Sequence, residues 1–518
     1  MKSKRAACGG IIAAWLAGCT VGPNYHGPPA EESTAPAKFK NGDEATGNWK
    51  VAEPADAQAR GAWWTIFHEP ELNELENQAG AANPDVRVAA GRVVEARALD
   101  RVAASQFYPD VTFAGSAVRQ RTTNTGPKQL GELVGSNPFG GAGAAAGATP
   151  AVPGMKAPSA ASSGSAPLVL AEQPLSTTYS LFRAPLELSW ELDLFGRLRR
   201  NYESYRAQRE AIEKDYQNVA LSVAANVAVN YFALRSLDAE IAILNRALAD
   251  RREALRISEE RLEAGLTSEL DVTRAKADLA SDESDLFAVQ RTRGEVENAI
   301  GTLVGRPASL VHLSTHPLST KNAPPRVPTS LPSKLLERRP DVAEAERQLA
   351  SANAQIGVAK AAFFPVIRLT GEGGFESADI RLLFNWQSRI WTLGPSITLP
   401  IFEGGKNIAN LKAAHARYDE AVGRYRGQVL TAFQDVENAL DDLHQLAGQA
   451  EADERALAAA QRSLLLARQQ YAKGQVNFLD VLDAERTALA DERLTAQLAG
   501  QRMQSTVQLV KALGGGWH

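Results

Sequence analysis

Cysteine, histidine and catalytic motifs are scarce in this chain. Of 518 residues only Cys8 and Cys19 are cysteines, and Cys8 lies in a segment that we expect to be removed, so no internal disulfide is predicted. The seven histidines are scattered. His312 and His316 have helical spacing but lie in a proline-flanked stretch without a third ligand, so no metal site is expected. We find no nucleophile elbow, His-Glu-x-x-His or phosphate-binding loop, and an enzyme is not expected.

Two further absences limit the partners of the chain. The formal net charge is -4, so nothing in the composition points to nucleic acid. Hydrophobic residues make up 44% of the chain, yet no run reaches the ~18 apolar residues that a membrane-spanning helix needs. If the chain enters a membrane, we therefore expect it to do so as β-strands.

The N-terminus has the pattern of a targeting segment. A basic start is followed by a short apolar stretch from Gly10 to Ala17, which is typical of a signal peptide. Leu16-Ala17-Gly18-Cys19 then resembles a bacterial lipobox. We predict a signal peptide over 1–18 and a diacylglycerol and an N-acyl lipid on Cys19, with Thr20 favouring the outer membrane. The alternative is an ordinary signal peptide with an incidental cysteine.

Glycine spacing indicates that the chain contains two copies of one unit. Four pairs of residues share an offset of 209 positions, namely Gly196 with Gly405, Gly265 with Gly474, Asp271 with Asp480, and Gly305 with Gly514. Such self-similarity is the signature of a repeat. We place the copies at 63–306 and 339–514, preceded by a Pro-, Gly- and Ala-rich tether over 19–62. A proline-rich crossover over 307–338 joins the copies, and 515–518 form a tail.

Each copy contains a very long helix. The pattern from Arg197 to Leu262 holds about 66 residues without proline, which would span about 100 Å. Every seventh position is apolar, at Val227, Leu234, Ile241, Leu248, Leu255 and Leu262. The second copy repeats this seam within Lys406 to Tyr471. Sustained heptads predict coiled-coil helices, each followed by a glycine break and a shorter return helix.

Four segments alternate with the period of a β-strand, at about 110–121, 176–195, 366–376 and 391–402. In the second, Leu186, Leu188, Trp190 and Leu192 share one face and Glu187, Ser189 and Glu191 the other. Residues 122–175 are of low complexity and form a loop insertion whose role stays open.

Four strands are too few for a single-chain membrane barrel, which starts at eight, and lipid does not tolerate an open sheet edge. We therefore predict a mainly α fold with a small β part. In this prediction three chains share a 12-stranded outer-membrane β-barrel, and their helices form a trimeric periplasmic α-barrel. The alternatives are a soluble antiparallel sheet packed on helices, or a surface-anchored coiled-coil adhesin, which would not require alternating strands.

A set of short motifs, in this order on a duplicated scaffold, resembles one known family. They are Leu16-Ala-Gly-Cys19-Thr-Val-Gly-Pro-Asn-Tyr25, Trp63-Trp64-Thr-Ile-Phe67, Asn83-Pro84-Asp85, Trp190-Glu-Leu-Asp-Leu-Phe-Gly196, Arg339-Pro340-Asp341, Leu399-Pro-Ile-Phe-Glu-Gly-Gly405 and Gly474-Gln-Val-Asn-Phe-Leu-Asp-Val-Leu-Asp483. The chain resembles the TolC-like outer-membrane efflux ducts, in their lipoprotein (NodT-type) branch.

The resemblance implies a homotrimer, lipid-anchored in the outer membrane and extending into the periplasm. It would dock with a periplasmic adaptor (membrane fusion) protein and an inner-membrane RND pump and release drugs or other small molecules. The alternative within the family is the duct of a type I protein or peptide secretion system. No cofactor is implied beyond the lipid on Cys19.

The resemblance also assigns roles to residues at the glycine breaks. It implies that the adaptor contacts Arg261, Gly265, Leu266, Tyr471 and Gly474, although the glycines could serve only as turns. It implies a periplasmic gate at Asp480, Asp483, Asp271 and Tyr471, although Asp480 and Asp483 could merely favour a helix N-terminus. Val476 stands where some members carry an arginine that bonds the acid matching Asp271, so a bond between Tyr471 and Asp271 is the remaining candidate.

Overall fold

The computed structural model describes residues 20–29, 40, 61–121, 178–319, 324–325, 327 and 338–515. The predicted signal peptide 1–18, the lipidation site Cys19 and the insertion 122–175 lie outside them. The chain divides into two units. The helical unit comprises Thr20–Ala103, Gly196–Ala362 and Glu403–His518, and the strand unit contains Ala104–Phe195 and Phe363–Phe402.

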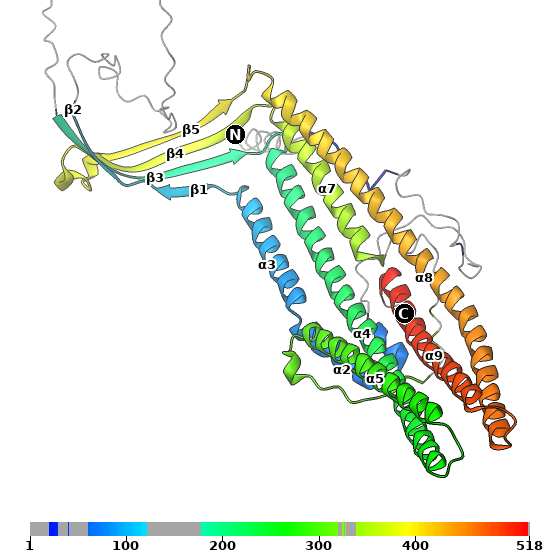
Figure 1. The fold of residues 1–518 in the computed structure, drawn as a ribbon. Helices are drawn as coiled ribbons and strands as arrows, with labels where there is room; N and C mark the ends of the chain where they lie inside the picture. The colour runs from blue at the N-terminus through cyan, green and yellow to red at the C-terminus, as the bar shows by residue number, and fades with distance from the viewer. Residues whose placement is uncertain are drawn as a thin grey trace, which may run out of the picture. The chain divides into compact units, whose positions relative to one another are not determined.

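Three pairs of helices show the duplication. They are α3 (Pro84–Ser105) and α7 (Pro340–Ala361) with 22 residues each, α4 (Arg197–Glu263) and α8 (Lys406–Ala472) with 67 each, and α5 (Glu269–Leu303) and α9 (Phe478–Ala512) with 35 each (Figure 1). The starts of α4 and α8 lie 209 residues apart, but those of α3 and α7 lie 256 apart. The first copy therefore carries 47 more residues between these helices, a span that includes 122–175.

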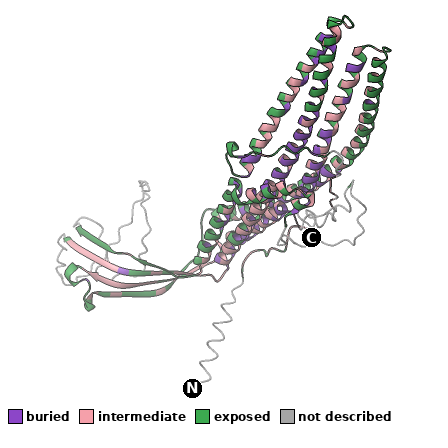
Figure 2. Cartoon of the chain, turned by 90° about the horizontal axis from the view of Figure 1, so that it is seen from below, coloured by how far each residue is buried: buried purple, intermediate pink, exposed green. Residues whose placement is uncertain are grey.

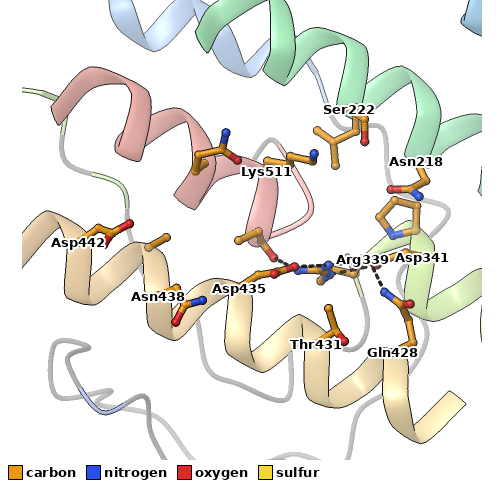
Figure 3. A pocket seen from close by; sticks show the side chains of 15 residues that line it. Asn218, Ser222, Arg339, Asp341, Gln428, Thr431, Asp435, Asn438, Asp442 and Lys511 are labelled. Atoms are coloured by element: carbon orange, nitrogen blue, oxygen red, sulfur yellow. Dashed lines mark hydrogen bonds and ion pairs between the residues drawn. The ribbon is translucent and has the colours of Figure 1, made fainter. Parts of the chain in front are cut away.

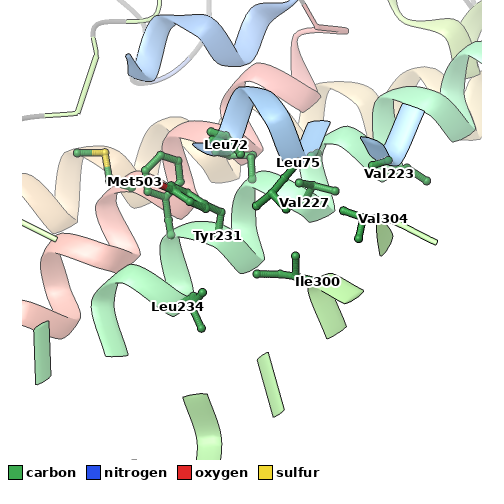
Figure 4. Packing of buried hydrophobic residues seen from close by; sticks show 14 of the residues in the cluster. Leu72, Leu75, Val223, Val227, Tyr231, Leu234, Ile300, Val304 and Met503 are labelled. Atoms are coloured by element: carbon green, nitrogen blue, oxygen red, sulfur yellow. The ribbon is translucent and has the colours of Figure 1, made fainter. Parts of the chain in front are cut away.

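The heptad seam of α4 forms the centre of the helical unit. Val227, Leu234 and Leu248 are 0%, 0% and 2% exposed. Val227 and Leu234 belong to a cluster that also draws on α2 (Pro70–Ala82), α5 and α9, as Figure 4 shows for Leu72, Leu75, Ile300, Val304 and Met503. Further toward Gly265 the seam is only half-buried. One window of α4 is apolar enough to cross a membrane, with mean hydropathy 1.2, but half of it is buried inside the unit, which is typical of a core helix.

Residues 20–29 form no helix or strand, but they are packed against the helices. Arg200 of α4 is buried and donates to Asn24 Oδ1 at 2.6 Å and to the carbonyl oxygens of Val21 and Gly22. A Cβ on Gly22 would lie 2.5 Å from the Cα of Gly357 in α7. The predicted tether is thus held at its first described residues, because a buried guanidinium needs acceptors and backbone carbonyls supply them.

The strand unit holds one antiparallel sheet. Its strands are β1 (Asp110–Phe113), β2 (Ser116–Arg121), β3 (Thr178–Leu192), β4 (Val366–Ser377) and β5 (Arg389–Thr398). β1 and β2 both pair with β3, then β4 and β5 follow, so the strand predicted over 110–121 is split. The split lies opposite Pro185, which has no N–H to donate; Ala114 still donates to its carbonyl oxygen at 3.1 Å.

The register gathers apolar side chains on one face of this sheet. Phe113 pairs with Leu186, Trp190 with Leu369, and Ile367 with Ile397, and directly paired residues share a face. The other face carries Thr112, Glu187, Glu372 and Thr392 in one row. Figure 2 shows the sheet as exposed or intermediate except for one short buried segment, and Pro185 of β3 and Leu383 are the only buried residues among those described in this unit. The apolar face therefore has no cover within the described chain.

Candidate functional site

Both long helices end in the same hydrogen-bonded glycine turn. Gly265 has φ 70° and donates to Leu262 O at 2.9 Å, and Leu266 donates to Arg261 O at 2.8 Å. Gly474, also at φ 70°, and Gln475 repeat these bonds to Tyr471 O and Gln470 O. This is the Schellman motif, which satisfies the last carbonyls of a helix. Nothing lies within 4 Å of a Cβ at either glycine, so φ alone requires glycine.

Apolar side chains are exposed around these turns. Leu266 follows Gly265 directly and is 69% exposed. Leu270 and Leu479, in the first turns of α5 and α9, are also exposed. Large contiguous patches of exposed apolar groups mark surfaces that bind other proteins, whereas single exposed leucines are common on any protein. We use "tip" below for the two turns with Arg261, Leu266, Leu270, Tyr471 and Leu479.

Arg261 and Tyr471 connect the two copies at the tip. Arg261 Nη1 of α4 donates to Tyr471 Oη of α8 at 2.9 Å, and the guanidinium carbon lies 5.2 Å from the tyrosine ring centroid. The ring also packs on Phe478 at 5.6 Å between centroids. The structure thus brings an expected adaptor-contact residue and an expected gate residue into one interaction.

The bond considered between Tyr471 and Asp271 is not formed in this structure. The Asp271 carboxylate instead accepts hydrogen bonds from Thr267 Oγ1 at 2.9 Å and Ser268 Oγ at 3.0 Å. Slight burial acts to raise the pKa of Asp271, but these hydrogen bonds outweigh it and hold the pKa below its usual range. Asp271 is satisfied at the start of its own helix, so its carboxylate does not need the tyrosine.

Asp480 and Asp483 have different surroundings. Asp480 forms a capping box with Asn477, since its backbone N–H donates to Asn477 Oδ1 and its carboxylate accepts from the Asn477 N–H, both at 3.1 Å. Asp483 lies one turn further with its side chain 76% exposed, and Arg486 is 3.9 Å away. Asp480 therefore stabilises the helix start, whereas Asp483 presents its charge to solvent.

A set of ion pairs that no sequence pattern indicates joins α4, α5 and α9. Arg251 of α4 pairs with Asp278 and Asp282 of α5, and Asp278 also pairs with Arg486 of α9. Arg251, Asp278 and Asp282 are each less than a tenth exposed. Burial raises the pKa of Asp282, although Arg251 opposes it.

Nearer the core, Arg493 of α9 forms a second group of ion pairs, with Glu240 of α4 and Asp285 of α5, both at 2.7 Å. We call these seven residues the interhelix ion chain. It couples the hairpin of the first copy to the return helix of the second.

The Arg-Pro-Asp motif has a structural role. Arg339 is 7% exposed and donates to Ala512 O at 3.1 Å, Asp341 at 2.6 Å and Asp435 at 2.9 Å (Figure 3). Gln428 donates to Asp341 at 2.7 Å. These contacts tie the start of α7 to α8 and the end of α9, beside a cavity of about 430 Å³.

An uncovered amphipathic sheet together with paired helical hairpins defines an outer-membrane channel protein. The sequence matches the family model described as "Outer membrane efflux protein" over residues 75–306 and 331–515. It is 31% identical to the cation efflux system protein CusC of Escherichia coli O6:H1 over 507 residues, which cover 98% of each chain. It is also 31% identical to the solvent efflux pump outer membrane protein SrpC of Pseudomonas putida, over 97% of this chain and 96% of that one.

Solved structures agree. The outer-membrane channel OprN matches with a TM-score of 0.77 and 30% identity, over 96% of this chain and 100% of that chain. The MtrE outer membrane channel of Neisseria gonorrhoeae matches with a TM-score of 0.74 and 28% identity, over 96% and 98%. The chain belongs to the outer membrane efflux protein family. It is an efflux channel of the outer membrane, and its long helices with a small β part are the fold expected from the sequence.

Proposed function

We propose that this channel works as a homotrimer and is the outer-membrane duct of a tripartite RND-type efflux system. The β-sheet is the observation that supports the trimer. Its described strands end in two free edges, β1 with β2 on one side and β5 on the other. Its apolar face is uncovered, with Phe113 68%, Trp391 79% and Ile397 68% exposed. Edges paired between chains would satisfy the backbone groups that lipid cannot.

The tip supports the partner assignment. A periplasmic adaptor would bind the exposed Leu266 and Leu270 and the glycine turns, and an inner-membrane RND pump would deliver the substrate. The proposed substrates are drugs or other small molecules, since relatives are named for efflux of cations, solvents and toluene. A lipid on Cys19 would add an anchor in the outer membrane. No catalytic step is proposed.

The mass of the detergent-extracted complex by light scattering, with the detergent subtracted, tests the trimer. We expect three times the mass of one chain. A monomer that stays soluble without detergent would overturn the shared barrel. In cells, deletion should raise the intracellular level of an efflux dye such as ethidium and leave secreted proteins unchanged, whereas loss of a secreted protein would favour the type I secretion alternative.

A further inference from the structure

A second cavity, away from the tip, holds a buried carboxylate. It has a volume of about 400 Å³ and lies in the helical unit among η2 (Trp63–Phe67), α2, the start of α3 and α4. Its lining includes Trp63, Trp64, Glu76, Tyr216 and Leu221. None of its lining residues belongs to the tip.

One carboxylate oxygen of Glu76 lacks a hydrogen-bond partner within the described part of the chain. Its side chain is 3% exposed, and no described residue forms a hydrogen bond with Oε1. Buried polar groups are nearly always hydrogen-bonded, and each exception calls for an explanation. Tyr216 of α4 is the other titratable residue that lines the cavity, while η2 contributes tryptophans and α3 contributes Val86. No cation among the lining residues neutralises the carboxylate.

The aromatic residues supply the complementary feature. Trp63 and Trp64 meet edge to face with 5.8 Å between ring centroids. The faces of indole rings attract cations, and do so most strongly where water is excluded. A carboxylate and two indoles around one largely apolar space therefore favour a ligand with a positive charge on an apolar body.

We propose that the cavity beside Glu76 binds a small organic ammonium ion, with the charge at the Glu76 carboxylate and the apolar part against Trp63 and Trp64. The ligand would lie between α2 and α4 and would be separate from whatever passes through the channel. The proposal does not depend on the trimer or on the pump.

Proton release gives the proposal a specific signature. Burial raises the pKa of Glu76 to about 9, so the empty site holds a proton at neutral pH. A bound cation favours the ionised carboxylate, and each binding event therefore releases one proton. The affinity should rise about tenfold for each unit of pH up to about pH 9, because the competing proton becomes scarcer.

Calorimetric titration of the detergent-solubilised full-length protein with benzyltrimethylammonium chloride tests this. We expect one saturable site per chain, tighter by about tenfold per pH unit between pH 6 and pH 8, and no such site for uncharged benzyl alcohol. Glu76→Gln should weaken binding at least tenfold. The matched control is Glu74→Gln, two residues away on α2, where the exposed carboxylate only accepts from Gln78 at 3.1 Å; it should bind like the wild type.

Three outcomes would overturn the proposal. They are no saturable binding by the wild type, equal binding by Glu76→Gln, and binding that does not vary with pH. The pH series on the wild type needs no variant, so it decides the matter even if Glu76→Gln folds poorly. Helix content by circular dichroism would show whether it does.

Discussion

Arg261 and Tyr471 are 210 positions apart in sequence, yet a 2.9 Å hydrogen bond joins them across the two copies at the tip. The positions that the duplication equates with them are Gln470 and Leu262, so the second copy cannot form the reciprocal bond. The link is therefore single in each chain and breaks the internal symmetry at the end of the long helices.

Tyr471→Phe should loosen the tip while it keeps the ring contacts with Arg261 and Phe478. A hydrogen bond to a half-exposed charged group contributes about 1 kcal/mol. Its loss should change global stability little, but we expect a higher conductance or more frequent openings in planar bilayers. Tyr205→Phe, on the exposed part of α4, is the control and should leave the current unchanged. A Tyr471→Phe channel with wild-type conductance would show that the link does not restrain the tip.

Asp480 and Asp483 should separate into a structural and an electrostatic role. Asp483→Asn removes an exposed charge and should reduce the preference for cations without lowering the melting temperature. Asp480→Ala removes half of the capping box and should cost about 1 kcal/mol, seen as faster hydrogen exchange in the first turn of α9. Asn477→Ala should reproduce that exchange but not the change in selectivity. If ion selectivity is the same in Asp483→Asn as in the wild type, Asp483 is not part of a gate.

The tip glycines should tolerate substitution better than a glycine with a close neighbour. Gly265→Ala and Gly474→Ala place a Cβ at φ 70° in open space, so each should cost only the left-handed strain of about 1–2 kcal/mol. Gly305→Ala has the same φ, but its Cβ would lie 2.4 Å from the carbonyl oxygen of Ala82. Thermal melting should show the largest loss of stability for Gly305→Ala. Equal losses of stability in all three variants would mean that the left-handed backbone strain alone sets the cost of substitution.

The sequence predicts those structural features whose physical cause lies within a few neighbouring residues. The glycine turns and the heptads follow from a backbone requirement and a short period, and the structure places them as predicted. The ion pairs of Asp278 with Arg251 and Arg486 join three helices that are far apart in sequence, and no local pattern marks these charges as partners. Glu76 lies in a short helix beside the exposed Glu74, and its burial comes from the packing of η2 and α4. The contacts of Arg200 with residues 21–24 likewise arise only in three dimensions.

Glu76 should make stability depend on pH in a direction opposite to that of an ordinary ion-paired acid. Its pKa rises from 4.5 to about 9 on folding, so its contribution is full below about pH 4.5 and is lost as the pH rises toward 9. Glu76→Gln stays neutral throughout. In thermal melting without added ligand, the free energy of unfolding of Glu76→Gln should rise relative to that of the wild type between pH 5 and pH 9, by up to a few kcal/mol.

Glu74→Gln, which removes an exposed carboxylate, should track the wild type over the same range. A constant difference between wild type and Glu76→Gln from pH 5 to pH 9 would mean that Glu76 titrates like an exposed acid and is not desolvated as the structure indicates.

Asp278 should be the most sensitive member of the interhelix ion chain, because it alone pairs with arginines on both α4 and α9. Asp278→Asn leaves Arg251, which is 7% exposed, with Asp282 as its remaining partner. Removing one partner from a buried pair costs about 3–5 kcal/mol, and the shared partner should lower that to about 2–3 kcal/mol. We expect a lower melting temperature and, since α5 and α9 lose a direct connection, higher conductance.

Arg246→Gln is the matched control. It breaks the 2.6 Å pair with Glu492, which also joins α4 to α9, but Arg246 is 68% exposed, so the loss should stay below about 0.5 kcal/mol. If both variants melt and conduct alike, burial does not strengthen the ion pairs of Asp278, and the connection between α5 and α9 must rest on other contacts, such as the pair of Arg493 with Asp285. A large effect in Asp278→Asn only would identify these buried charges as the connection through which movement of one return helix reaches the other.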